Sequence, residues 1–460
     1  MKNDKGLAVI SLLAVLLCAA ALIALGVGVF RAGPPPEIRI VAGAPAIGKR
    51  TGIKVQVSEP RRGLSSIRME LVQGDKTQKL QEKSYRPRGQ FQFWGPRTEQ
   101  DTITCDAGRA VIPWLTEGNA VIRVTAGRAG TWLRSPDPAI RELGLPVRLT
   151  PPSLQVRSSR TYATQSGCEV VIYQVGESAV RDGVRSGAWW FPGYPLPGGG
   201  KQDRFALFAV PYDMIQPDIR LVAVDGAGNE AEARFLDMFI RKSFRSDTIQ
   251  LTAAFLEKVV PEIVSHSPEL KDRGNLVDNF LEINTVLRKE NAGDLRKMAL
   301  GSQPRFLWHR PFLMMPNGKA MAGFADHREY RYEGRDLDRQ DHLGFDLAVT
   351  RRSPVPAAND GIVVCARYFG IYGNTVVIDH GYGLMSLYGH LSAIDVKDGQ
   401  QVKRGDVIGA TGATGLAGGD HLHFTTLLQG LPVNPVEWWD AHWIEDRIAS
   451  KLGTALPFEP

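Results

Sequence analysis

The stretch DHLHF, residues 420–424, indicates a β-strand whose two histidines could bind a metal or contact a substrate. Side chains alternate along a strand, so His421 and His423 project from one face while Leu422 points into the core. One histidine of such a pair can bind a metal while the other faces a substrate. Alone, the pattern is equally typical of two hydrogen-bonded core histidines.

Two further segments change that balance: HLGFD at residues 342–346 and YGHL at residues 388–391. A catalytic zinc takes three protein ligands from His, Asp, Glu or Cys and leaves a fourth position for water. His342 and Asp346 are four residues apart, so a turn or a short strand can bring both side chains to one point. Three such segments in one glycine-rich β region predict a metal site.

The region over roughly 335–440, about a quarter of the chain, resembles the M23 family of metallopeptidases, the lysostaphin and LytM type. The resemblance extends beyond the histidines to segments that occur in the family's order: GNTVVIDHG (373–381), LYGHL (387–391), GDVIG (405–409), GATG (412–415) and PVNP (432–435). It implies an antiparallel β domain with an open groove and one zinc ion at the base.

The resemblance also implies roles for individual residues. The zinc ligands would be His342, Asp346 and His423, and the two catalytic histidines that do not bind the metal would be His390 and His421. As a hypothesis, His421 is the base that accepts a proton from water, and His390 stabilises the developing oxyanion.

The function implied is a zinc-dependent endopeptidase that hydrolyses peptide cross-links in bacterial peptidoglycan. One alternative is a LytM-type regulatory or binding protein that activates other wall hydrolases; some relatives of that kind lack the metal ligands. A second alternative keeps the zinc and changes the substrate to a protein. All three ligands and both accessory histidines are present here, which favours the enzyme.

The N-terminus predicts a membrane anchor. No charged residue occurs from Gly6 to Phe30, and a helix of that length exceeds the roughly 30 Å hydrocarbon core. Lys2 and Lys5 precede it, which favours a single-pass protein of the inner (cytoplasmic) membrane with most of the chain on the periplasmic or extracytoplasmic side. A cleaved signal peptide is the alternative, although its apolar region is normally shorter. Cys18 is interpreted as part of the apolar segment.

The chain is expected to be mainly β. Alternation at Gly52–Val57 and Ser66–Gln73, and later strands such as Cys168–Val175, predict one or two immunoglobulin-like β-sandwich modules. Their role could be spacing, occlusion of the enzyme, or binding to the wall or to envelope or cell-division proteins. The expected parts are a cytoplasmic tip and anchor (1–32), a β-sandwich-like module (33–145), a second β module (146–244), a helical connector (245–300), the M23-like zinc peptidase domain (301–445) and a tail (446–460).

Three segments before the first ligand have distinct patterns. Ile249–Val260 is helical in composition, with Asp247 or Thr248 as N-cap, and Asn275–Leu287 carries one apolar helical face. The connector is therefore expected to dock on a neighbour. The charged, tyrosine-rich segment 317–340 could form a groove wall or lid, or an exposed hairpin.

The net charge and the cysteines say little about the function. A net charge of +6 over 460 residues suits a partly anionic wall polymer, and no Lys/Arg cluster points to nucleic acid. Cys105, Cys168 and Cys365 are odd in number, so at least one is unpaired or pairs between chains. A Cys105–Cys168 disulfide is one possibility and three buried thiols are the other.

Overall fold

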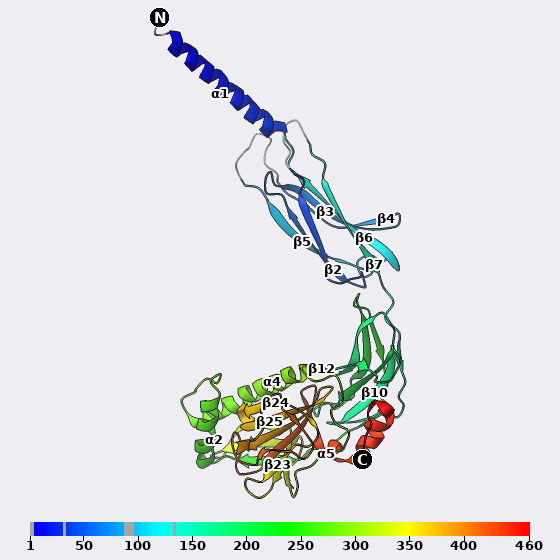
Figure 1. Ribbon diagram of the computed structural model, residues 1–460, viewed down its shortest axis with the longest axis vertical. Coiled ribbons are helices and arrows are strands. Elements are labelled where there is room, and N and C mark those ends of the chain that lie inside the picture. The colour runs from blue at the N-terminus through cyan, green and yellow to red at the C-terminus, as the bar shows by residue number, and fades with distance from the viewer. Residues whose placement is uncertain (1–3, 31–33, 87–95, 132–134) are drawn as a thin grey trace. The chain divides into compact units, whose positions relative to one another are not determined.

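The computed structural model describes residues 4–30, 34–86, 96–131 and 135–460 (Figure 1). The chain divides into two compact units, residues 1–152 with 224–230, and residues 153–223 with 231–460. Strands dominate both units, so the expected mainly β architecture is confirmed.

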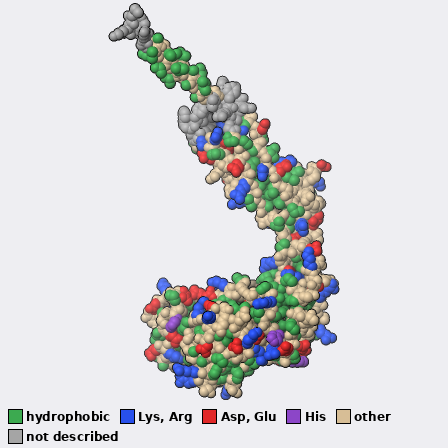
Figure 2. All heavy atoms as spheres, viewed as in Figure 1, with side chains coloured by type: hydrophobic (Ala, Val, Ile, Leu, Met, Phe, Trp, Pro, Cys, Tyr) green, Lys and Arg blue, Asp and Glu red, His purple; other side chains and the backbone are tan. Residues whose placement is uncertain are grey.

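Helix α1 spans Asp4–Phe30. Its segment Ala8–Gly26 is long and apolar enough to cross a membrane by length and composition, and a signal sequence would meet the same criterion. Hydrophobic side chains are exposed along the helix (Figure 2), Leu12, Leu16 and Ile23 among them. An aqueous environment would penalise so continuous an apolar surface.

The first β region consists of two antiparallel sheets, ordered β1-β2-β5 and β4-β3-β6-β7. Both sheets contribute to one apolar core: Ile53 and Val55 of β2 and Ile67 and Met69 of β3 are fully buried. The alternation expected at Gly52–Val57 is thus confirmed. The strands are β1 (Glu37–Ala42), β2 (Thr51–Ser58), β3 (Leu64–Gln73), β4 (Lys76–Ser84), β5 (Gln100–Ala107), β6 (Gly118–Arg128) and β7 (Ala139–Val147).

The second β region has two four-stranded sheets, β13-β14-β10-β8 and β12-β11-β15-β16, and a parallel pair, β17-β9. Its apolar residues share a core with the C-terminal region, where Phe205 of β14 contacts Phe306 and Tyr382. The strands are β8 (Leu154–Val156), β9 (Tyr162–Thr164), β10 (Cys168–Val175), β11 (Ala179–Ser186), β12 (Trp189–Pro192), β13 (Tyr194–Pro195), β14 (Asp203–Ala209), β15 (Ile219–Asp225), β16 (Glu230–Ala233) and β17 (Met238–Ile240).

The helical segment begins later than its composition predicts. Residues Ser246–Gln250 form strand β18, and helix α2 spans Ala253–His266. The N-cap is Thr252, whose hydroxyl accepts from the backbone N–H of Phe255, so the expected start at Asp247 or Thr248 is wrong. Ile249 pairs with a neighbouring strand instead, and that tertiary pairing outweighs local propensity.

The next helices are continuous with one another. Asn275 caps α3 (Leu276–Glu282), which runs through the π turn η1 (Ile283–Leu287) into α4 (Arg288–Leu300). Their buried apolar face packs with Tyr330 and Ile371 of the C-terminal domain, so the predicted docking of this segment is confirmed.

The C-terminal domain is built on an eight-stranded sheet, ordered β19-β22-β30-β26-β25-β24-β28 with β31 beside β30. Two small sheets, β18-β20-β21 and β23-β29-β27, complete it. The strands are β19 (Lys319–Ala322), β20 (Asp326–Tyr332), β21 (Arg335–His342), β22 (Phe345–Ala348), β23 (Pro354–Pro356), β24 (Gly361–Tyr368), β25 (Asn374–Gly381), β26 (Leu384–Leu391), β27 (Ala393–Ile394), β28 (Gln401–Val402), β29 (Val407–Ala410), β30 (Leu422–Leu428) and β31 (Leu431–Val433).

The 3-10 turn η2 (Gly370–Tyr372) lies between β24 and β25. Short helices follow the last strand: α5 (Pro435–Trp439), α6 (Ala441–Ile444), η3 (Glu445–Ala449), α7 (Ser450–Leu452) and η4 (Gly453–Ala455). Trp438 of α5 is fully buried against Trp308 and Phe312. The C-terminal helices therefore belong to the core of this unit.

The four cysteines are unpaired in the part of the chain that the structure describes, so the Cys105–Cys168 disulfide is not formed. Cys168 and Cys365 are buried. Burial raises the pKa of Cys365 to about 11, so both thiols behave as apolar core groups.

Candidate metal centre and active site

Strand β30 lies at the centre of the site. Its antiparallel pairing with β22 sets Asp346 opposite His423, and its pairing with β26 sets Gly389 opposite the same histidine. His342 is the last residue of β21, and Gly344 lies in the short connection from it to β22. Sheet register therefore brings together residues that are far apart in the sequence.

Three potential ligand atoms converge. His342 Nε2 lies 2.9 Å from Asp346 Oδ1 and 3.1 Å from His423 Nδ1, and the last two atoms are 3.0 Å apart. His342 and His423 are buried. This group could hold a metal ion.

Hydrogen bonds on the far side of each ring fix which nitrogen carries a lone pair. His342 Nδ1 lies 2.9 Å from the carbonyl oxygen of Gly323, which can only accept, so Nδ1 donates and Nε2 is free. The Thr425 hydroxyl donates to the carbonyl of Leu343 at 2.9 Å and accepts from His423 Nε2 at 3.0 Å. Nδ1 of His423 is therefore the nitrogen with the lone pair.

Three hydrogen-bond acceptors thus face one another with no donor among them. The arrangement is unfavourable unless a proton or a cation lies between them, and it is the donor set that a tetrahedral metal site requires. Burial lowers the pKa of His423 to about 4, so its ring is neutral at physiological pH.

Asp346 has a cation on its other oxygen. Arg328 of β20 donates from Nη2 to Asp346 Oδ2 at 2.9 Å, which leaves Oδ1 for the cluster. Burial alone would raise the pKa of the Asp346 carboxyl, but whenever the cluster carries a proton, hydrogen bonds and charge from His342, His421 and His423 hold that pKa well below its usual range. Asp346 is therefore a carboxylate.

The connection between the first two ligands requires a glycine. A Cβ atom on Gly344 would lie 2.5 Å from the His423 ring and 2.6 Å from Thr425 Oγ1. Only a residue without a side chain lets β22 approach β30 closely enough for Asp346 to meet His423.

His390 and His421 flank the cluster. Their ring centroids are 4.9 Å apart, and that of His390 is 5.6 Å from His423. Nδ1 of His390 donates to the carbonyl of Thr414 at 2.8 Å, and Nδ1 of His421 donates to that of Gly419 at 2.8 Å. Both rings thus keep Nε2 for other contacts, and that of His421 lies 3.4 Å from Asp346 Oδ1.

The two flanking histidines differ in charge preference. Burial, helped by His421 and His423, holds the pKa of His390 well below its ordinary value. Burial opposes the charged form of His421 as well, but the hydrogen bond to Asp346, the charge of that carboxylate and the hydrogen bond to Gly419 together outweigh it and raise the pKa. His390 also has a backbone φ of +61°, a left-handed conformation that non-glycine residues adopt at a cost and that is common at functional sites.

All five residues line one cavity of about 120 Å³. Arg328 and Tyr330 form its wall on the β20–β21 hairpin, so the segment 317–340 contributes a groove wall. The remaining lining residues are Arg288, Ile371, Tyr372, Leu416, Ala417 and Gly418.

Helix α2 is bound to the loop that leads to His421. Lys258 Nζ donates to the carbonyl of Ala417 at 3.1 Å, and Glu262 Oε1 accepts from the backbone N–H of Gly415 at 2.8 Å. Helix α2 therefore supports the loop that contributes Leu416, Ala417 and Gly418 to the cavity lining.

Three polar residues close to these motifs have partners outside the cluster. His380 is buried between the carbonyl of Asp360 and the Ser386 hydroxyl, and both contacts are structural. Asp341 accepts from the Tyr212 hydroxyl at 2.7 Å, and Asp420 accepts from the backbone of Arg352, so neither orients the histidine that follows it.

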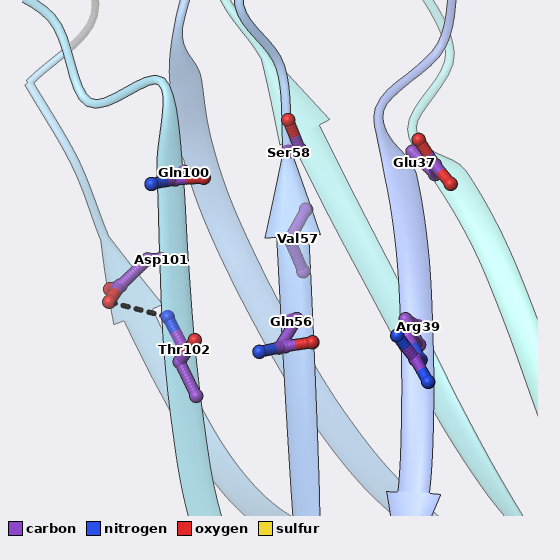
Figure 3. A pocket seen from close by; sticks show the side chains of 8 residues that line it. All are labelled: Glu37, Arg39, Gln56, Val57, Ser58, Gln100, Asp101 and Thr102. Atoms are coloured by element: carbon purple, nitrogen blue, oxygen red, sulfur yellow. Dashed lines mark hydrogen bonds between the residues drawn. The ribbon is translucent and has the colours of Figure 1, made fainter.

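A larger cavity, of about 570 Å³, lies on the first β region (Figure 3). Strands β1, β2 and β5 line it with Glu37, Arg39, Gln56, Val57, Ser58, Gln100, Asp101 and Thr102. It is wide open and its described lining residues bring no histidine or cysteine together, so the smaller cavity is the candidate active site.

Three residues at the site were not identified from the sequence: Arg288, Arg328 and Thr425. Arg328 lies in the charged segment that was interpreted as a groove wall or hairpin, but one arginine among several carries no signal of its own. Thr425 lies two residues after His423 on the same strand face, which is the signal that could have indicated it.

Comparison with known proteins agrees with this geometry. Residues 340–435 match the profile of Peptidase family M23. Over 96 residues the chain is 46% identical to the peptidoglycan DD-endopeptidase ShyA of Vibrio cholerae, covering 21% of this chain and 22% of that one. Over 95 residues it is 44% identical to the DD-carboxypeptidase/endopeptidase Mpg of Neisseria meningitidis, again 21% and 22%.

Among solved structures, the catalytic domain of lysostaphin from Staphylococcus simulans is 27% identical, with a TM-score of 0.23, covering 27% of this chain and 92% of that one. The chain spans about a fifth of the length of the curated relatives it matches. The C-terminal region from 340 to 435 is a Peptidase family M23 domain.

Proposed function

We propose that this protein is a zinc-dependent endopeptidase that hydrolyses peptide cross-links in peptidoglycan. The observation that carries the proposal is the complete set of groups on one cavity: three convergent ligand atoms and two histidines whose Nε2 atoms lack backbone partners. A regulatory protein of the same fold has no need for all five.

Zinc is the metal that this donor set fits. Two neutral imidazoles and one carboxylate suit a four-coordinate ion with one open position, and soft thiolates are absent from the described lining of the cavity. Zinc held by His342, Asp346 and His423 would polarise the scissile carbonyl and bring the pKa of water toward neutrality.

His390 and His421 are the proposed catalytic residues that handle protons. Each ring donates its Nδ1–H to a backbone carbonyl and so presents Nε2 to the cavity. A histidine in that position can accept a proton from water or stabilise a developing oxyanion, and we propose His421 as the acceptor and His390 as the oxyanion stabiliser.

The substrate proposal follows from the relatives. ShyA is named a peptidoglycan DD-endopeptidase and Mpg a DD-carboxypeptidase/endopeptidase. We propose peptidoglycan as the substrate here, with α1 anchoring the chain in the inner membrane and both β regions and the peptidase domain on the extracytoplasmic side. Envelope or cell-division proteins remain proposed partners of the upstream β regions.

The test uses the full chain in detergent with purified peptidoglycan sacculi, loaded with zinc or treated with a chelator. Mass spectrometry of the released fragments identifies the bond that is cut. Release that requires zinc and is lost in His342→Ala supports the proposal. No zinc-dependent release from any type of wall by protein that contains one zinc per chain contradicts it.

A further inference from the structure

Arg288 is a cation that lines the metal cavity, but it belongs to a helix that precedes the M23 domain at residues 340–435. It is the first residue of α4 and lines the same cavity as His342, Asp346 and His423. The π turn η1 directly precedes it, and π turns within α-helices occur often at functional sites.

The side chain of Arg288 is held in a defined orientation. Its Nη2 donates to Asn284 Oδ1 at 2.6 Å and its Nε donates to the Asn284 backbone carbonyl at 3.2 Å. Asn284 is fully buried, and its Nδ2 donates to Asp338 Oδ2 at 2.8 Å. Gln340 donates to the same carboxylate at 2.9 Å. Because Asp338 takes the amide N–H, the amide oxygen has to face Arg288.

The charge of Arg288 is not neutralised within the protein. Arg328, the other guanidinium on the cavity, is paired with Asp346. Within the described ranges, no carboxylate oxygen lies within the 4.0 Å ion-pair distance of Arg288. Two of its five N–H groups are bonded to Asn284, and the others have no described acceptor.

We propose that Arg288 is a specificity residue that binds a free carboxylate of the substrate peptide beside the scissile bond. The inference rests on the proposed peptidase function and adds the class of peptide selected: anionic rather than neutral. A planar guanidinium with unused parallel N–H groups matches a carboxylate in a bidentate arrangement. The carboxylate is either the terminal α-carboxylate or that of an acidic side chain next to the cut.

Two pairs of probes distinguish these sources. The first is N-acetyl-D-alanyl-D-alanine and its C-terminal amide, and the second is N-acetyl-D-glutamyl-D-alanine amide and its D-glutaminyl counterpart. The pair in which wild-type protein prefers the acid identifies the carboxylate that Arg288 binds. Equal use of both members of both pairs overturns the proposal.

The variants are Arg288→Gln, Arg288→Lys and the control Lys289→Gln, which removes the same charge from an exposed neighbour on α4. We expect Arg288→Gln to raise KM for the preferred acid by about 10- to 100-fold with kcat nearly unchanged, and to leave the amide unaffected. Arg288→Lys should recover part of the preference, and Lys289→Gln should match the wild type. A preference that survives in Arg288→Gln overturns the proposal.

A binding measurement separates this inference from the proposed function. NMR titration of metal-free protein with each probe reports recognition without a metal that would itself attract the carboxylate. Tighter binding of an acid that is lost in Arg288→Gln supports the inference even if no variant cleaves peptidoglycan. Cleavage without any dependence on Arg288, in activity or in binding, refutes the inference and leaves the proposed function standing.

Discussion

Replacing Thr425 with valine tests how the metal cluster is assembled. Valine has nearly the same shape, so the change removes the hydroxyl that joins His423 Nε2 to the carbonyl of Leu343. The change affects which ring nitrogen of His423 carries the proton. Without an acceptor at Nε2, the neutral His423 ring can carry its proton on Nδ1, where Asp346 Oδ1 lies 3.0 Å away as a ready acceptor.

The magnitude follows from comparing the two states. The metal-free protein gains a hydrogen bond inside the cluster and loses little, whereas the metal-bound protein has to keep Nε2–H buried without a partner. Groups that orient a ligand in this way typically contribute 10- to 100-fold in metal affinity, or about 1.4 to 2.7 kcal/mol. We expect Thr425→Val to weaken zinc binding by that factor.

The assay is competition with a chromophoric chelator, and the chain offers a matched control one residue further on. Thr426 is fully buried, and its hydroxyl has no partner among the described residues, so Thr426→Val should leave zinc affinity unchanged and stabilise the fold by up to about 1 kcal/mol. Equal zinc affinity of Thr425→Val and wild type, or equal weakening by both valine variants, would refute the reasoning.

The other predictions concern activity, pH and metal removal. Alanine at His390 or at His421 should leave zinc content at one per chain and lower kcat by about 10²- to 10⁴-fold, and full activity in zinc-loaded variants would exclude the catalytic role. Burial raises the pKa of Glu437 to about 8, so the folded state holds its proton more tightly than the unfolded state does. The free energy of unfolding should therefore fall by at most about 1.4 kcal/mol per pH unit as the pH rises from 5 to 8. Glu437→Gln should flatten that slope in thermal unfolding. Zinc at 100 times its Kd should stabilise the protein by about 2.7 kcal/mol, and an unchanged Tm after chelation would contradict zinc binding by the folded protein.

Much of the fold was predictable because strand alternation is a local signal. At β2 and β3 the apolar residues repeat every second position and face one core, as the sequence indicated. The alternation failed to locate β18, where Ile249 is followed by a helical pattern and only pairing with β20 keeps the chain extended. A strand of five residues next to a helix has too few positions to reveal its period.

The residues of the candidate site also fall into two groups, those that the local sequence indicates and those that only tertiary packing places there. His342, Asp346 and His423 have recognisable spacing and neighbours, so the sequence could indicate them. Arg328 and Arg288 act at the cavity only because of how β20 and α4 pack. Their positions depend on tertiary register, and nothing in the local sequence distinguishes them from surface arginines.

The pairing of β18 with β20 has a consequence for chain continuity. Parallel neighbours need a crossover, and here the crossover is the whole stretch from 251 to 325, helices included. Residues 271–275 within it are exposed. A protease that cuts there would leave two fragments held together by the hydrogen bonds between β18 and β20 and by the packing of α2 against α3. The nicked protein should separate on a denaturing gel yet elute as one species under native conditions.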